Sequence, residues 1–167
     1  MTSPPLTRTS FRQALGHFAT GVTVVTVERG PGLVHGMTAN SFASVSLHPF
    51  LVLVCVDHRA KLLGYLKDRL RFGINVLKRD QQAWSEYFAK AEHLPQVEER
   101  LGIRPHWTPN GVPVLDGTLA QLACKVAAFH AAGDHTVVVG EVQEAHTQPG
   151  EPLLFYRGAY HSVGHGA

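Results

Sequence analysis

The chain has 167 residues, of which 44% are hydrophobic and 17% are charged, and its formal net charge at pH 7 is +2. This length is enough for one domain with a substantial core, and the composition is that of an ordinary soluble globular protein. The small charge, without a run rich in Lys and Arg, argues against a nucleic-acid partner. No membrane association is expected, because no apolar run approaches the roughly 20 residues that a bilayer-spanning helix needs.

The cysteines and histidines indicate neither a disulfide framework nor a metal site. Cys55 and Cys124 lie in apolar stretches without a Cys-x-x-Cys spacing and are expected to be buried free thiols. Unpaired cysteines, without an apolar signal segment at the start of the chain, fit a cytoplasmic location. The eleven histidines are scattered, and no helical stretch carries the His-x-x-x-His pair of a metal-binding helix.

The start of the chain is expected to be separate from the domain. Residues 1–9 are expected to form a flexible N-terminal arm, and residues 10–165 a single domain. Ser10 followed by Gln13 matches a capping box, in which a hydroxyl and an amide side chain satisfy free backbone N–H groups. A short first helix is therefore expected to begin there and to end by Gly21.

Periodicity predicts most of the remaining elements. The run 51–56 is continuously apolar, so we expect a central strand covered on both faces. The segment 119–132 is ambiguous, because its alanines favour a helix while its alternating pattern favours a strand. Asp80 is positioned to cap a helix. The other expected strands are 22–27, 72–77, 137–142 and 153–156, and the other expected helices are 61–71 and 96–101.

This order of elements predicts a fold class. Several strands with short turns, and no regular alternation of strand and helix, indicate an antiparallel sheet or barrel with helices packed outside it. The chain has no Gly-x-Gly-x-x-Gly after a strand and no Walker-type loop. A Rossmann-type cofactor site is therefore not supported.

Five ordered motifs run along most of the chain. They are FRQALGHFATGVTVVT (11–26), GMTANSFASVSL (36–47), FGINVL (72–77), GDHTVVVGEV (133–142) and PLLFYRGAY (152–160). Together they resemble the short-chain flavin reductases with the FMN-binding split-barrel fold. The resemblance covers about residues 10–160 and favours a strand over 119–132.

The resemblance implies a fold, an assembly and an activity. The fold would be mainly β with flanking helices, as a six-stranded antiparallel Greek-key split β-barrel, and the assembly a homodimer with flavin in a groove near the dimer interface. The activity would be that of an NAD(P)H:flavin oxidoreductase, in which NADH or NADPH reduces FMN or FAD by hydride transfer. Many members of the family supply reduced flavin to a partner monooxygenase.

Two other functions are open at this stage. One is a flavin-binding protein that stores flavin or transfers electrons without NAD(P)H activity. The other is an antiparallel barrel that binds another ligand such as haem, with His17, His58 or His135 as the axial ligand.

The small and hydroxylic residues in 36–47 are expected to hold the flavin. Small residues let the backbone approach the ring, and short polar side chains donate to its edge. Without the resemblance, the same stretch is a strand that ends in a polar turn. Alternating serines would share one face, which the resemblance places along the ribityl chain and phosphate. The expected ligands are Thr38, Ala39, Asn40, Ser41, Ser44 and Ser46.

A second group of residues is expected to bind the flavin phosphate. The segment after the 51–56 strand opens a helix, and helix N-termini offer free N–H groups to anions. Arg59, Ala60 and Lys61 are the expected contacts. The family often has Ser or Thr where this chain has Ala60 and Lys61, so the charged side chain would replace a hydroxyl contact.

The Gly133-Asp134-His135 motif is the sharpest single feature. Gly133 permits a tight turn, Asp134 braces it, and His135 begins a strand. The resemblance places His135 at the nicotinamide site, where a neutral imidazole would donate to the carboxamide or form the wall beside it. His135 is the expected catalytic residue, and Tyr160, in preference to Tyr156, is the expected ring that faces the cofactor.

Overall fold

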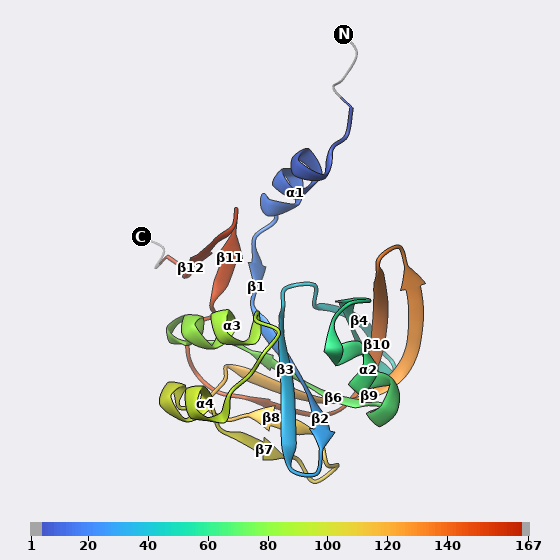
Figure 1. The fold of residues 1–167 in the computed structure, drawn as a ribbon, viewed down its shortest axis with the longest axis vertical. Helices are drawn as coiled ribbons and strands as arrows, with labels where there is room; N and C mark the ends of the chain where they lie inside the picture. Colours follow the sequence, from blue (N-terminus) through green and yellow to red (C-terminus); the bar gives the residue numbers. More distant parts are fainter. Residues whose placement is uncertain (1–4, 165–167) are drawn as a thin grey trace.

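One large antiparallel sheet dominates the computed structural model, which describes residues 5–164 (Figure 1). Its strand order is β3-β2-β6-β9-β10-β5-β4, and every neighbouring pair is antiparallel. The strands are β2 (Thr23–Gly30), β3 (Leu33–Ala39), β4 (Ala43–Leu47), β5 (Phe50–Asp57), β6 (Arg71–Val76), β9 (Ala120–Ala132) and β10 (His135–Thr147).

Two small sheets and the helices surround this sheet. One small sheet has the order β1-β11-β12, and the other pairs β7 with β8. The small strands are β1 (Thr20–Gly21), β7 (Pro105–Trp107), β8 (Pro113–Leu115), β11 (Leu154–Tyr156) and β12 (Ala159–His161). The helices are α1 (Arg8–Gly16), α2 (Lys61–Arg69), α3 (Gln82–Phe88) and α4 (Pro95–Leu101), with a 3₁₀ turn η1 (Arg79–Gln81).

The segment 119–132, ambiguous from its residues alone, is a strand, as its alternation together with the family resemblance favoured. β9 pairs with β6 on one side and β10 on the other, so its backbone groups are satisfied by two neighbours. Alternate side chains at one end enter the core, where Cys124 is 1% exposed. Tertiary pairing therefore overrides the helix propensity of its alanines.

A single apolar cluster joins both ends of the sheet. Val25 of β2, Val54 of β5, Phe72 of β6 and Val138 of β10 are fully buried in it, together with Leu66 of α2. Helix α2 contacts β2, β3, β5 and β6, so it fills the concave side of the curved sheet. The mainly β architecture with flanking helices is confirmed. The sheet has seven strands, and within residues 5–164 its edge strands β3 and β4 do not pair with each other to close a barrel.

The first helix begins earlier than expected. Thr7 is its N-cap, and its hydroxyl accepts from the Ser10 backbone N–H at 3.1 Å while Ser10 Oγ accepts from the Thr7 backbone N–H at 3.0 Å. The capping box predicted for Ser10 and Gln13 is therefore wrong, because a hydroxyl three residues earlier starts the helix. The helix ends at Gly16 rather than near Gly21.

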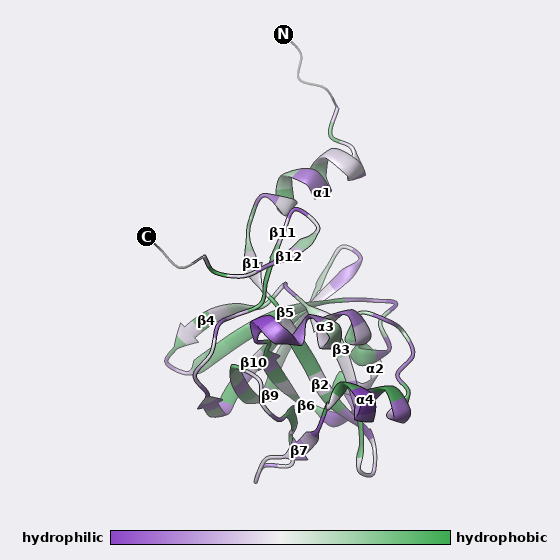
Figure 2. Cartoon of the chain, turned by 90° about the vertical axis from the view of Figure 1, so that its left-hand side faces the viewer, coloured by the Kyte–Doolittle hydropathy of each residue, from purple (hydrophilic) through white to green (hydrophobic). Residues whose placement is uncertain are grey.

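Helix α1 stands apart from the body of the protein (Figures 1 and 2). None of its residues is buried, and Phe11, Leu15 and the following Phe18 are 50%, 58% and 77% exposed. The predicted arm over residues 1–9 overlaps the start of this helix. Residues 1–4 of the arm and residues 165–167 lie outside the described part of the chain.

Two further local predictions are wrong. Asp80 does not cap a helix, because the chain enters α3 through the 3₁₀ turn η1, where Gln81 Oε1 accepts from the Lys78 backbone N–H at 2.8 Å. Strand β5 is not covered on both faces in the single chain. Val54 is fully buried, whereas Leu53 on the opposite face is only half-buried.

The cysteines differ in their burial. Cys124 is buried as expected, but Cys55 on the outer face of β5 is only partly buried. Both are free thiols, and burial raises the pKa of Cys124 to about 12. Across the described residues no helix is long and apolar enough to span a bilayer, and no three His, Cys, Asp or Glu side chains gather to hold a metal ion.

Candidate functional site

The predicted Gly-Asp-His motif forms the tip of the β9–β10 hairpin. Gly133 has φ +63° at the first position of the two-residue turn, a conformation that glycine adopts without strain and that a type II′ hairpin requires. His135 is the first residue of β10 and lies opposite Asp57, the last residue of β5. The sheet thus sets the histidine beside the segment predicted to bind phosphate.

The imidazole of His135 is held by its neighbour. His135 Nδ1 lies 2.6 Å from Asp134 Oδ1, and the side chains of His135 and Asp134 are 41% and 77% exposed. This hydrogen bond lowers the pKa of Asp134. The carboxylate is therefore ionised at neutral pH and accepts a hydrogen bond from the Nδ1–H group, which leaves Nε2 directed away from this pair.

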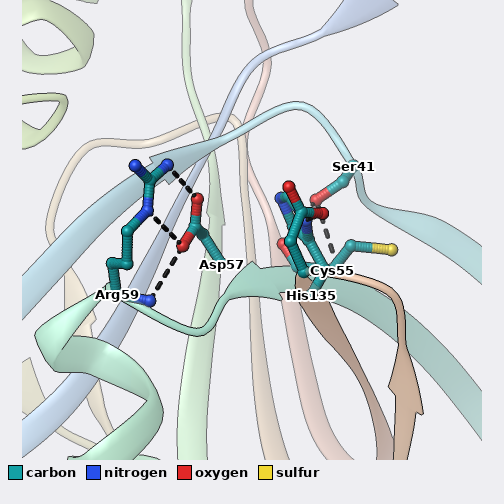
Figure 3. Close-up of polar contacts among 6 residues, drawn as sticks. Ser41, Cys55, Asp57, Arg59 and His135 are labelled. Atoms are coloured by element: carbon teal, nitrogen blue, oxygen red, sulfur yellow. Dashed lines mark hydrogen bonds and ion pairs between the residues drawn. The ribbon is translucent and has the colours of Figure 1, made fainter.

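Arg59 turns back onto Asp57 (Figure 3). Its Nη2 lies 2.7 Å from Asp57 Oδ2, and its Nε and backbone N lie 3.0 and 2.8 Å from Asp57 Oδ1. These hydrogen bonds hold the pKa of Asp57 well below its usual range and raise that of Arg59. Much of the Arg59 charge is thereby neutralised locally.

The N-terminus of α2 remains available to an anion. Its N-cap residue Ala60 makes no side-chain cap, and Lys61 is exposed without an ion-pair partner among residues 5–164. The turn that precedes this helix is tied to the hairpin tip, because the His58 backbone N–H donates to the Asp134 carbonyl at 3.0 Å. The segments predicted to bind phosphate and nicotinamide therefore lie side by side.

Ser41 joins the same edge of the sheet through its hydroxyl. Ser41 Oγ donates to the Cys55 carbonyl at 3.0 Å and accepts from the Cys55 N–H at 3.1 Å (Figure 3). This double contact extends the pairing of β4 with β5 beyond the first pair of that ladder, Ala43 and Leu53. The Ser41 hydroxyl is thus engaged in hydrogen bonds with the protein backbone. In the proposed site, the backbone of Ser41 would be the part that contacts a ligand.

Thr38 and Tyr160 meet through a buried serine. Thr38 Oγ1 donates to the Ser85 carbonyl at 2.6 Å, and Ser85 Oγ lies 2.8 Å from the Tyr160 hydroxyl. The Tyr160 ring also packs edge-on against Phe155, with ring centroids 5.3 Å apart. Tyr160 therefore fixes the position of β3, and its contact with a cofactor stays a prediction.

Asn40 borders a wide groove at the α1 end of the protein. This groove has a volume of about 1020 Å³ and lies between α1, the turn after β3 and the β11–β12 turn. Asn40 is exposed and Ala39 beside it is buried. The groove is open on the side where α1 stands away from the sheet, so Asn40 is positioned to meet a ligand there.

The two predicted serine ligands do not share one face. A β-bulge lies between Ser44, which pairs with Val52, and Ser46, which pairs with Leu51. The bulge breaks the alternation on which the shared face was predicted. Ser46 Oγ accepts from the His48 N–H at 3.1 Å, and Ser44 is exposed.

Three residues of this region were not singled out from the sequence. Asp57 could have been found, because an acidic residue directly after an apolar strand and two positions before Arg59 is a common local ion pair. Cys55 and Ser85 act through backbone or buried contacts with residues distant in the sequence. No local sequence pattern predicts such contacts.

The fold and the site define a mainly antiparallel β protein with an open polar site at one edge of its sheet. Residues 15–164 match the family described as "Flavin reductase like domain", and the chain belongs to this family. A "NADH-dependent flavin reductase" of a Rhodococcus species is 45% identical over 162 residues, which are 96% of this chain and 89% of the relative.

Two other comparisons agree. "FMN reductase (NADH) SmoA" of Agrobacterium fabrum is 45% identical over 153 residues, covering 90% of this chain and 83% of the relative. The solved structure of "Flavin reductase PheA2 in native state" superposes with a TM-score of 0.87 at 41% identity, covering 96% of this chain and all of the other. Further relatives are named as reductase components of monooxygenases.

Proposed function

We propose that this chain is an NADH-dependent flavin reductase that reduces FMN or FAD. The observation that carries the proposal is the joining of the His135 hairpin to the uncapped N-terminus of α2 in a chain of the flavin reductase family. Its relatives are named NADH-dependent reductases of flavin, FMN or FAD. The alternatives of flavin storage without NADH activity and of haem binding are therefore not favoured.

The residues of the site fit a flavin nucleotide. The uncapped α2 N-terminus and the unpaired Lys61 offer N–H groups and a charge to its phosphate. The buried Ala39 and the exposed Asn40 offer close backbone and a free amide to the ring edge. A bound flavin would supply the hydride-accepting chemistry.

The protein's own contribution is orientation. His135, braced by Asp134, would contact the nicotinamide carboxamide and set the ring beside the flavin. No proton needs to pass through His135, since hydride moves directly between the two cofactors. In the same proposal Thr38, Ser41 and Gly133 shape the backbone around the ligand, and Arg59 lies at its rim while paired with Asp57. The exposed Ser44 would lie along the ribityl chain, with Ser46 on the other face of β4.

A partner oxygenase belongs to the proposal. Relatives at 38% identity are named "Flavin-dependent monooxygenase, reductase subunit HsaB" and "4-hydroxyphenylacetate 3-monooxygenase, reductase component". By this likeness, the chain would pass reduced flavin to an oxygenase in the cytoplasm.

The homodimer and the closed barrel are also proposed. Six of the seven main strands, β2, β3, β5, β6, β9 and β10, would form the split barrel around α2, with β4 as an added edge strand. A second copy would cover apolar side chains that the single chain leaves exposed. These are Phe11, Leu15 and Phe18 around α1 and Val45, Leu47 and Phe50 around the β4–β5 turn.

A direct assay tests the proposed activity. Protein is mixed with NADH and either FMN or FAD, and the loss of NADH absorbance is followed, with NADPH in a parallel series. The proposal expects flavin-dependent NADH oxidation by the purified chain. A protein that binds flavin but oxidises neither NADH nor NADPH would instead support the alternative function of flavin storage or electron transfer.

A further inference from the structure

A second pocket lies on the other side of the α2 N-terminus. It has a volume of about 220 Å³ and opens between the β2–β3 hairpin, α2 and the segment that follows α3. Its charged and aromatic lining residues are Arg29, His35, Lys61, Tyr65, Glu92 and His93. None of the residues predicted from the sequence except Lys61 belongs to it.

The pocket lining carries more positive than negative charge. Among the described residues, neither Arg29 nor Lys61 has an ion-pair or hydrogen-bond partner for its side chain. Glu92 is the single acidic lining residue, so the two fixed cations exceed it. Arginine and lysine left unpaired around a concave site are typical of anion recognition.

The two histidines add hydrogen-bonding groups to the same wall. The rings of His35 and His93 lie 5.0 Å apart, and His93 Nε2 is buried without a hydrogen-bond partner in the described chain. Burial, His93 and the cations Arg29 and Lys61 lower the pKa of His35 to about 4, and burial lowers that of His93. An anion in the pocket would relieve this repulsion among like charges.

The pocket is too small for a whole nucleotide. Sites that enclose complete small ligands have volumes of roughly 300–1,000 Å³, so about 220 Å³ suits one group of a longer ligand. Lys61 connects this pocket to the predicted flavin site. It begins α2, the predicted site of the flavin phosphate, and it also lines the pocket.

We propose that the pocket lined by Arg29, His35, Lys61 and His93 binds the adenosine-side phosphate of FAD. The inference rests on the proposed function, because it places the first phosphate at the α2 N-terminus. FMN ends at that first phosphate and does not reach Arg29. FAD continues by one phosphate and its adenosine, so the pocket makes the protein selective for FAD over FMN.

The test compares the affinities of FAD and FMN for three variants. Arg29→Gln removes the charge, Arg29→Lys keeps it, and Arg100→Gln is the matched control, because Arg100 is an exposed arginine on α4 outside the pocket. Kd is measured by isothermal titration calorimetry with FAD and FMN separately. NADH oxidation with FMN is measured for each protein as the readout of the proposed activity.

The wild type is expected to bind FAD more tightly than FMN. Arg29→Gln should raise the Kd for FAD by about tenfold, as the loss of one charge-assisted contact does, and leave the Kd for FMN within twofold. Arg29→Lys should restore most of the FAD affinity, and Arg100→Gln should change neither. FMN-dependent NADH oxidation by Arg29→Gln should equal that of the wild type.

Three results would overturn the inference while leaving the reductase activity in place. These are equal losses of FAD and FMN affinity in Arg29→Gln, unchanged affinity for both flavins, and a raised KM for NADH alone. The last would assign the pocket to the nicotinamide dinucleotide. A wild type that oxidises NADH with neither flavin would instead contradict the proposed function.

Discussion

His135 Nδ1 lies 2.6 Å from Asp134 Oδ1, and this contact sets which nitrogen of the imidazole meets a ligand. A carboxylate only accepts hydrogen bonds, so the proton of the neutral ring is held on Nδ1 and Nε2 keeps its lone pair. The family resemblance implied that this histidine donates to the nicotinamide carboxamide or forms the wall beside it. The observed pair instead favours acceptance by Nε2 of a carboxamide N–H.

Replacing His135 tests its place at the nicotinamide site. We expect His135→Ala to raise the KM for NADH by about tenfold, the cost of one hydrogen bond in a partly exposed site, with the Kd for flavin little changed. His146→Ala is the control, because His146 is exposed near the other end of β10. A loss of flavin binding with intact NADH kinetics would contradict the assignment.

Asp134 is expected to act through His135 rather than on the ligand. Asp134→Ala frees the imidazole to rotate and to change tautomer, and it should raise the KM for NADH by about threefold, less than His135→Ala does. Asp134→Asn should have a smaller effect, because its amide oxygen still accepts from Nδ1. Steady-state kinetics decide the order, and an Asn variant worse than the Ala variant would refute the bracing role.

Asn40 and Ser41, neighbours in one predicted motif, should respond differently to substitution. Asn40→Ala should weaken flavin binding by about 1–2 kcal/mol and leave stability unchanged, because its amide is free at the groove. Ser41→Ala should lower the free energy of unfolding by about 1–2 kcal/mol, since the Cys55 backbone loses both its contacts. Flavin titration and urea denaturation separate the two, and equal flavin losses with unchanged stability would contradict the distinction.

The sequence predicted what depends on local pattern. Alternation together with the family resemblance identified β9 against its alanine content, and Gly133 marked a turn that needs positive φ. Contacts between segments that are distant in the sequence could not be predicted from local pattern. The pairing of His135 with Asp57 follows from strand register, and the use of the Ser41 hydroxyl on Cys55 follows from how two strands end.

The histidine pair in the second pocket predicts how stability changes with pH. The pKa of His35, lowered to about 4, lies below its ordinary value of 6.5, so the unfolded chain takes up a proton first as the pH falls. Stability present above pH 6.5 is therefore lost between pH 6.5 and 4, and this group causes no further loss below pH 4.

Solvent screening at this partly exposed site reduces that loss to about 2 kcal/mol. His35→Gln should flatten the pH dependence over the same interval, with flavin absent. Urea unfolding of the wild type and the variant at pH 7, 5.5 and 4.5 measures the difference. Parallel curves for the two proteins would show that His35 does not carry this linkage.

The exposed apolar side chains of α1 and the β4–β5 turn predict a homodimer. Phe18, Leu47 and Phe50 are 77%, 74% and 59% exposed, and large apolar side chains left this exposed mark interaction surfaces. A two-fold pair, the commonest soluble assembly, would cover them and wall the groove beside Asn40. Light scattering coupled to size exclusion should give twice 18.2 kDa.

Substitutions in this surface should separate the subunits and release the flavin together. Leu47→Ser with Phe18→Ser should shift the wild-type dimer toward the monomer and weaken flavin binding, because each site would lose the wall supplied by its partner. Leu33→Ser is the control, since Leu33 is 51% exposed on the β2–β3 hairpin, away from this surface. Dilution of the wild type should release flavin in parallel with dissociation. A wild-type monomer that holds flavin tightly would refute the shared site while leaving the reductase activity intact.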